Sequence, residues 1–336
     1  MEFTFEHIVS LLRGGGEELF AEADRVRRLT VGDGIHLRGL IEYTNICHKN
    51  CLYCGIRRDS RVARYTLTDD QVIASVRYAV EQGFGSVVIQ GGEICAEAHV
   101  EAIERIVRRI SGMDGPAVVL SLGEQTAGTY RRWFDAGASR YLLRIESSDP
   151  ALYARIHPAD HSFDRRLEAL RDLRRTGYEV GTGVMIGLPW QSVESLAHDL
   201  LFMRKFDIDM CGMGPYLECD GTPLASFAHE TQGSQQWRGE LTLRMIAILR
   251  LMMPDINIAS TTALQAISPD MRLRGLSCGA NVAMPNISPS ELRANYVLYD
   301  NKPVGIDPRI LEMARPNGVN PRGRSMRFMR RECNVI

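Results

Sequence analysis

The chain has 336 residues, of which 45% are hydrophobic, and its 40 basic and 41 acidic side chains nearly cancel. This balance argues against nucleic acid as the main partner, and no apolar run approaches the ~20 residues that span a bilayer. The N-terminus lacks the charged and then apolar pattern of a signal peptide, so we expect a cytoplasmic protein whose cysteines are reduced thiols or metal ligands.

Helical and strand patterns alternate along most of the chain. Two short helices are expected over 4–13 and 16–28. A later helix is expected between Thr68, its N-cap residue, and Gly83, which follows its C-terminus as a C′ glycine. The expected strands cover 36–44, 86–90, 117–122, 141–146, 179–187, 209–216, 256–261 and 279–285. Further helices are expected near 96–111, 124–136, 163–176, 192–205 and 238–252.

This alternation predicts the fold class. Strands that alternate with helices build a parallel sheet, and eight such units close a (β/α)8 TIM-type barrel of the α/β class. We assign the barrel to 36–300, a helical extension to 1–35, and a tail packed on the barrel to 301–336. A six-stranded partial barrel is the main competing count. An open doubly wound sheet is disfavoured, because no G-x-G-x-x-G motif follows the first strand.

Three cysteines follow the first expected strand, in the stretch TNICHKNCLYCGIRRD. Cys47, Cys51 and Cys54 have the spacing C-x3-C-x2-C, which suits a [4Fe–4S] cube held by thiolates. With three ligands, one iron keeps an open position, and an open position on a metal indicates catalysis. The competing interpretation is a structural zinc site with a distant fourth ligand, which usually shows a second short pair of ligands.

Polar residues recur at the strand ends, where barrel enzymes place their active sites. The second strand ends in GGE, residues 91–93, whose glycines let the backbone approach a ligand while Glu93 can accept from an ammonium group. Arg144 and Glu146, two apart in an expected strand, should face the same side. They form either a structural ion pair or a site for a ligand that carries both charges. Arg166 could add a second guanidinium for a carboxylate.

The cysteine motif, with the aromatic Tyr53 before its last cysteine, together with GGE resembles the radical S-adenosylmethionine (SAM) superfamily. The stretches LSLGE, YLLRIES, DMCGMGPY and CGANVAMPN resemble, within it, the HydE family of [FeFe]-hydrogenase maturases. 3-Methylornithine synthase (PylB) and biotin synthase share the general plan. The resemblance covers about residues 30–300.

The resemblance implies a role for each matching position. Cys47, Cys51 and Cys54 would hold the cluster, and SAM would bind the open iron and be cleaved reductively to a 5′-deoxyadenosyl radical. The residues implied for SAM binding are Tyr53, Gln90, Gly91, Gly92, Glu93, Ser121, Glu146, Arg166 and Met213. The residues implied for the substrate, in a deeper anion-binding cavity to which Ser121 also belongs, are Arg38, Arg144, Thr261, Thr262 and Tyr299.

The family further implies an iron–cysteine substrate that carries CO and cyanide, a reductant such as flavodoxin or ferredoxin, and other hydrogenase maturases as partners. Two features depart from the family. Residues 296–332 lack the second group of three cysteines that many members carry, and Ile94 and Cys95 follow GGE in place of the usual acidic residue. Two alternatives stay open: a PylB-like enzyme acting on a small amino acid, and a non-catalytic iron–sulfur scaffold.

Overall fold

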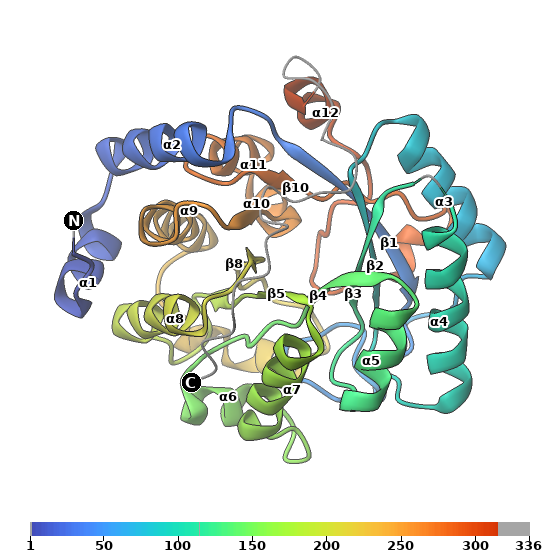
Figure 1. Cartoon of the computed structure of the whole chain (residues 1–336). Coiled ribbons are helices and arrows are strands. Elements are labelled where there is room, and N and C mark those ends of the chain that lie inside the picture. Colours follow the sequence, from blue (N-terminus) through green and yellow to red (C-terminus); the bar gives the residue numbers. More distant parts are fainter. Residues whose placement is uncertain (1, 114, 315–336) are drawn as a thin grey trace.

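The computed structural model describes residues 2–113 and 115–314 (Figure 1). Its longer helices are α1 Phe5–Gly14, α2 Glu17–Val31, α3 Asp69–Glu81, α4 Glu97–Ser111, α5 Ala127–Asp135, α7 Phe163–Thr176, α8 Val193–Phe206 and α9 Gln235–Met252. Its shorter helices are α6 Pro150–Ile156, α10 Thr262–Ile267, α11 Pro269–Leu276 and α12 Pro308–Ala314, with 3₁₀ turns at Pro223–Glu230 and Arg293–Asn295. Its strands are β1 His36–Thr44, β2 Ser86–Gly91, β3 Ala117–Ser121, β4 Ala138–Leu142, β5 Glu179–Thr182, β6 Met185–Ile186, β7 Met210–Cys211, β8 Gly214–Pro215, β9 Asn257–Ser260 and β10 Val282–Ala283.

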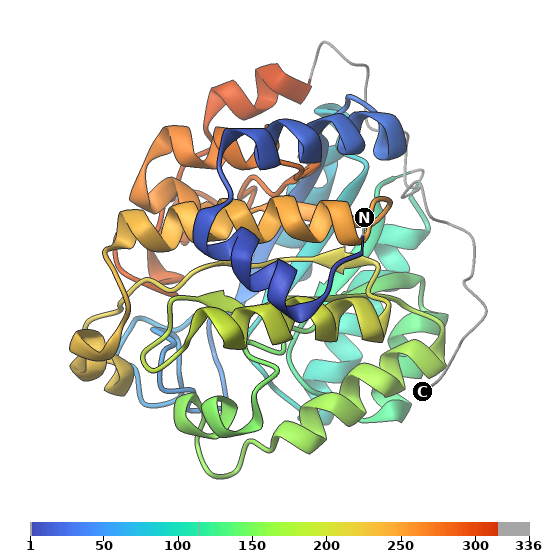
Figure 2. The same cartoon turned by 90° about the vertical axis from the view of Figure 1, so that its left-hand side faces the viewer.

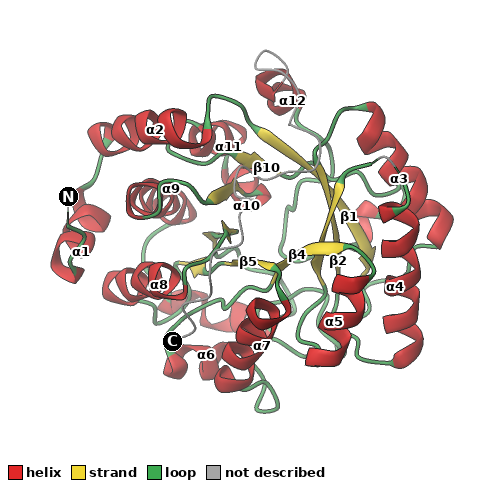
Figure 3. Ribbon diagram, viewed as in Figure 1, coloured by secondary structure: helices red, strands yellow, loops and turns green. Residues whose placement is uncertain are grey.

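Eight of these strands close a parallel barrel in the order β1-β10-β9-β7-β5-β4-β3-β2 (Figure 3). The closure is direct, since β1 pairs with β2 on one side, Gly39 opposite Val87, and with β10 on the other, His36 opposite Val282. The predicted (β/α)8 barrel is therefore confirmed, and the competing six-stranded count is wrong. The expected strands 179–187 and 209–216 each break in two, and their second halves, β6 and β8, form a small parallel ladder of their own.

The hydrophobic core lies mainly between the barrel and its ring of helices. Along β1, Ile41 faces this outer core, whereas Leu40 faces the barrel interior and packs there with Val88 and Val119. Met284 packs against this inner cluster and against a second one formed by Met210, Ala259 and Val282. These apolar side chains fill the lower part of the barrel and leave space only toward the carboxyl ends of the strands.

The helices begin where the sequence provides caps. Thr68 caps α3, as its position in the sequence predicted, and forms a complete capping box with Gln71. The N-terminal helices pack on the outside of the barrel, α1 against α8 and α9, and α2 against α9 (Figure 2). No helix among the described residues combines the length and the apolar character needed to cross a membrane.

The fourth strand differs from its expected range of 141–146. β4 pairs with β3 as far as Tyr141 and with β5 as far as Leu142, and the chain then leaves the barrel wall. Glu146 has φ 64° and touches the sheet through a single bridge to Val184. The apolar alternation of YLLRIE, which indicated a strand, reflects burial in the loop above β4.

The C-terminal segment returns to the barrel, since α12 contacts β1. Residues 315–336 of the expected tail, with Cys333, lie outside the described residues. The division of the chain at residues 35 and 300 stays a prediction.

Candidate functional site

One cavity of about 310 Å³ opens at the carboxyl ends of the barrel strands. Its mouth is formed by the cysteine loop after β1, and its floor includes Leu40 and Met284 from the inner apolar cluster. Side chains after β2, β4 and β9 line its walls, so residues far apart in the sequence meet at this edge of the barrel, as parallel strands require.

The three cysteine side chains line the mouth of this cavity, each partly buried and none in a disulfide. Burial raises the pKa of the Cys51 thiol to about 12 and raises that of Cys47 as well. The backbone N–H groups of Lys49 and Glu93 point at the sulfur of Cys47, at 3.4 and 3.3 Å. These donors favour a thiolate at Cys47, which is the form that ligates iron.

The GGE turn at the end of β2 packs closely against the cysteine loop. A Cβ atom placed on Gly92 would lie 2.1 Å from the carbonyl oxygen of Ile46 and 2.6 Å from the Cβ of Cys47. Only glycine permits this approach, which brings Glu93 beside the thiols. The set of three thiols on one loop, with a carboxylate next to them, fits a cluster with one open iron that receives an amino acid group.

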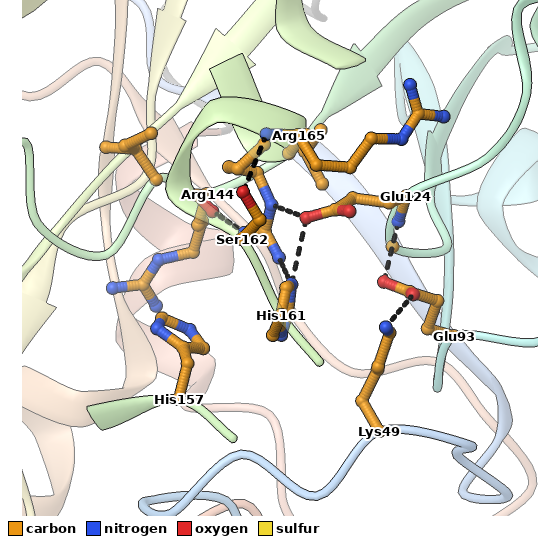
Figure 4. Close-up of polar contacts among 12 residues, drawn as sticks. Lys49, Glu93, Glu124, Arg144, His157, His161, Ser162 and Arg165 are labelled. Carbon is orange, nitrogen blue, oxygen red and sulfur yellow. Dashed lines mark hydrogen bonds and ion pairs between the residues drawn. The ribbon is translucent and has the colours of Figure 1, made fainter. Parts of the chain in front are cut away.

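A polar network connects the ends of β2 and β3 to the loop before α7 (Figure 4). Glu93 accepts a hydrogen bond from the backbone N–H of Glu124 at 2.8 Å, and Lys49 Nζ lies 3.8 Å from its other oxygen. Glu124 Oε1 in turn lies 2.5 Å from Arg166 Nε and 2.9 Å from His161 Nε2. Burial alone would raise the pKa of Glu124, but the contacts with His161 and Arg166 outweigh it and lower the pKa to about 2. Glu124 is thus ionised, and the positive charge of Arg166 balances its negative charge.

Two polar atoms without a partner, one of Arg144 and one of Thr261, belong to residues that line the cavity beyond this network. Arg144 Nη2 lies 3.0 Å from Glu146 Oε2 and donates to the carbonyl oxygen of Val184. Arg144 Nε and the Thr261 hydroxyl are buried and have no hydrogen-bond partner among the described residues, and Glu146 Oε2 has the ion pair with Arg144 in place of a hydrogen bond. Burial raises the pKa of Glu146, while the positive charges of Arg144 and Arg166 oppose the rise. Buried polar atoms without partners are costly, which indicates a site that a polar ligand completes.

The far side of the cavity is closed by residues near the C-terminus. The hydroxyl of Tyr299 lies 3.1 Å from that of Thr262, and burial raises the pKa of Tyr299 to about 12. Lys302 Nζ lies 2.5 Å from Glu42 Oε1, and Asn286 donates to the second oxygen of Glu42 at 2.8 Å. This ion pair is almost fully buried, with side chains 8% and 0% exposed.

The cavity brings together most of the residues that the sequence singled out. Its lining includes Cys47, Cys51, Tyr53, Cys54, Gln90, Gly91, Gly92, Glu93, Ser121, Arg144, Glu146, Arg166, Thr261, Thr262 and Tyr299. At Met213 the resemblance implied a role for the surrounding backbone, and the neighbouring Gly212 and Gly214 line the cavity, while the Met213 side chain belongs to the outer core. Arg38 lies two residues before Leu40 on the inner face of β1, below the floor, and donates to the sulfur of Met210 at 3.0 Å. The roles of these residues stay predictions.

Glu42, His161, Arg272 and Lys302 also line the cavity, although none of them was assigned a role from the sequence. Glu124, likewise without an assigned role, contacts the lining residues His161 and Arg166. Glu42 and Glu124 stand at or just after strand ends, and this position marks them as polar strand-end residues without indicating a role for either. His161 and Lys302 come from irregular loops, where neither periodicity nor a motif marks them.

Comparisons with known proteins agree with this geometry. Residues 41–203 match the model of the radical SAM superfamily. The chain is 45% identical over 306 residues to "[FeFe] hydrogenase maturase subunit HydE" of Thermotoga maritima, covering 90% of this chain and 85% of that protein. It is 28% identical over 289 residues to "3-methylornithine synthase" of Methanosarcina barkeri, covering 85% and 79%.

Solved structures show the same architecture. Methylornithine synthase (PylB) superposes with a TM-score of 0.73 at 25% identity, covering 84% of this chain and 82% of that one. HydG, a maturase of the [FeFe]-hydrogenase, also reaches 0.73, at 20% identity, covering 90% and 69%. At that identity the second likeness concerns the fold alone.

Proposed function

The chain belongs to the radical SAM superfamily and, within it, to the HydE family, and from this premise we propose that it acts in [FeFe]-hydrogenase maturation on an iron–cysteine intermediate carrying CO and cyanide. The cofactors of this family are a [4Fe–4S] cluster and SAM. When bound, they supply a 5′-deoxyadenosyl radical through reductive cleavage of the sulfonium.

Different residues of the cavity would bind the cluster and the parts of SAM. We assign cluster binding to Cys47, Cys51 and Cys54, the three thiols of the loop after β1. Glu93, next to them, would accept from the SAM amino group, while Arg166 would orient the methionine part and Glu146 the methionine and ribose part. The apolar floor and walls exclude water from the space in which a radical reacts.

One observation carries the proposal for the deeper part of the cavity. The three thiols at the mouth and the Thr262–Tyr299 pair at the far side line one cavity, and Arg144 and Thr261, which each carry a buried unpartnered atom, line it as well. Hydroxyl and guanidinium donors suit an anionic or cyanide-bearing ligand. This supports the substrate side of the site at Arg144, Thr261, Thr262 and Tyr299. Arg38, below the floor, would act through Met210, to whose sulfur it donates.

The chemistry is tested on anaerobically reconstituted protein with dithionite and SAM. We expect release of 5′-deoxyadenosine, and we expect Cys51→Ala to lose both this product and the visible absorbance of the cluster. If no 5′-deoxyadenosine forms, the protein is an iron–sulfur scaffold. An unchanged spectrum in Cys51→Ala would place the cluster elsewhere.

The substrate is tested by complementation of a maturation system that lacks HydE. Restored hydrogenase activity supports the proposal, which includes a flavodoxin or ferredoxin as reductant and other maturases as partners. The opposite charges of Arg144 and Glu146 also suit a zwitterion, which favours a PylB-like reaction on a small amino acid as the second candidate. Failed complementation with intact SAM cleavage would favour that candidate.

A further inference from the structure

The structure points to a role for His161 that neither a motif nor the comparisons assign. We propose that His161 donates a hydrogen bond from Nδ1 to the sulfur of Cys51 and thereby raises the reduction potential of the cluster. The inference rests on the proposed function, since it takes Cys51 as a cluster ligand. His161 is a positioning residue, because it acts on the cluster through Cys51.

The geometry of the contact is that of an N–H···S hydrogen bond. His161 Nδ1 lies 3.7 Å from Cys51 Sγ, and the imidazole side chain is 2% exposed, so water does not compete for the ring nitrogens. The ring is held in place by its neighbours. The His157 ring packs against it at 4.7 Å between centroids, and the His161 backbone N–H donates to the carbonyl of Pro158 at 2.9 Å.

The second ring nitrogen determines where the proton resides. His161 Nε2 lies 2.6 Å from Arg166 Nη2, and an arginine side chain can only donate. Nε2 is therefore the acceptor, and a neutral imidazole that accepts there carries its proton on Nδ1, toward Cys51. Glu124 Oε1 lies 2.9 Å from Nε2 and 2.5 Å from Arg166 Nε, so in this tautomer Oε1 and Nε2 both accept from the Arg166 guanidinium. Nε2–H donates to Glu124 only in the doubly protonated ring, which also carries a proton on Nδ1.

The other protonation states lead to the same donor or conflict with Arg166. A doubly protonated imidazole still has a proton on Nδ1 and still donates to Cys51. In a neutral ring protonated on Nε2, the Nε2–H group would point at the Arg166 Nη2–H group 2.6 Å away, and two donors at that distance repel each other. The contact with the buried Arg166 thus favours the tautomer with the proton on Nδ1, and the ion pair with Glu124 holds Arg166 in position.

A hydrogen bond to a cluster sulfur changes the potential because the added electron increases the negative charge on the ligands. The donor stabilises the reduced state more than the oxidised state, so the cluster accepts an electron more readily. A charge-assisted hydrogen bond of ordinary strength corresponds to about a tenfold change in the ratio of reduced to oxidised cluster, or 59 mV for one electron. The same network holds Glu93 and Arg166, so the residues proposed for SAM and the ligand Cys51 are ordered together.

The test is a redox titration of the reconstituted protein, monitored by electron paramagnetic resonance without SAM. His161→Leu removes the donor, and we expect about a tenfold lower ratio of reduced to oxidised cluster at a fixed potential. His161→Asn is the matched control, because its amide N–H can replace Nδ1–H, and its ratio should stay within about threefold of the original protein. A potential unchanged in His161→Leu at full iron content overturns the proposal, and so does an equal shift in both variants.

A measurement on the unchanged protein keeps the proposal testable if His161→Leu does not assemble a cluster. Protein labelled with ¹⁵N-histidine should show a nitrogen coupling to the reduced cluster in pulsed resonance spectra. His161→Asn should remove this coupling, and His157→Phe should retain it. Absence of the coupling in the labelled protein overturns the proposal, whereas a cluster that persists in Cys51→Ala contradicts the ligand assignment itself.

Discussion

The guanidinium of Arg144 lies 3.0 Å from the carboxylate of Glu146 although the chain has already left the sheet. β4 ends at Leu142, and Glu146 adopts φ 64°, a backbone region that is uncommon for residues other than glycine. The Glu146 N–H donates to the carbonyl of Gly183 at 3.0 Å, which holds this conformation in place. The two side chains therefore meet through a loop bend above the barrel, where they line the cavity.

Removal of either member of this pair should be more harmful than removal of both. Arg144→Met leaves the buried Glu146 carboxylate without its cation, and we expect the free energy of unfolding to fall by about 2 kcal/mol. The effect is smaller than for a fully buried pair, because the Arg144 side chain is 33% exposed. The double variant with Glu146→Gln should recover at least half of the loss. Urea unfolding of the cluster-free protein measures Arg144→Met, Glu146→Gln and the double variant, and strictly additive losses would contradict a coupled pair.

The barrel could be predicted because its strands are short apolar runs between amphipathic helices. β1 occupies the expected range His36–Thr44, and the closure into eight strands follows from the count. The expected strand 141–146 was misplaced, because apolar alternation reports burial and the bend at Glu146 keeps Leu143 and Ile145 buried without a sheet.

The site was predictable at strand ends and where a motif or the family resemblance marked a residue, as in the cysteine loop and at Tyr299. Unmarked residues of irregular loops were not predictable. Glu93 and Thr261 follow strands, and parallel strands bring their ends to one edge. His161 reaches the cavity from the turn before α7, and Lys302 from an irregular segment near the C-terminus, so only tertiary packing places them there. Arg38 shares the inner face of the barrel with Leu40, but depth along a strand is not encoded in alternation, and Arg38 lies below the floor.

Gly92 should be required for cluster assembly. An alanine there would place its Cβ 2.1 Å from the Ile46 carbonyl oxygen, so the cysteine loop must move away from β2. We expect Gly92→Ala to bind severalfold less iron after reconstitution. Gly34→Ala is the matched control, because a Cβ at Gly34 meets nothing within 4 Å, and it should bind iron normally. Equal iron content in both variants would show that the close approach is dispensable.

Asp199 should give the protein a pH-dependent stability that an asparagine abolishes. Burial in α8 raises the pKa of Asp199 from 3.8 to about 7, against the opposing effect of hydrogen bonds from the hydroxyl and backbone N–H of Ser148. The folded protein therefore retains a proton that the unfolded chain releases near pH 4. The contribution of Asp199 to the free energy of unfolding therefore falls as the pH rises from about 4 to about 7, by at most about 4 kcal/mol.

Asp199→Asn keeps the acceptor for Ser148 and is neutral at every pH. Asp199 Oδ2 has no hydrogen-bond partner among the described residues, so an amide nitrogen displaces none. We expect the variant to be the more stable protein at pH 8 and to differ little from it at pH 4.5. Urea unfolding at the two pH values measures the difference, and a parallel pH dependence of both proteins would show that Asp199 ionises normally.

The Thr261 hydroxyl should serve a ligand and contribute nothing to folding. Its oxygen is buried beside the cavity without a hydrogen-bond partner among the described residues, so Thr261→Val should leave the free energy of unfolding unchanged or raise it by about 1 kcal/mol. Thr182→Val is the matched control. The Thr182 hydroxyl donates to the Leu143 carbonyl at 2.8 Å and accepts from the Ile145 N–H at 3.0 Å, so its loss should cost about 1–3 kcal/mol.

In the maturation assay Thr261→Val should lower the yield of active hydrogenase while 5′-deoxyadenosine release without substrate is unchanged. A Thr261→Val protein that unfolds as readily as Thr182→Val would show that the hydroxyl has a structural partner instead.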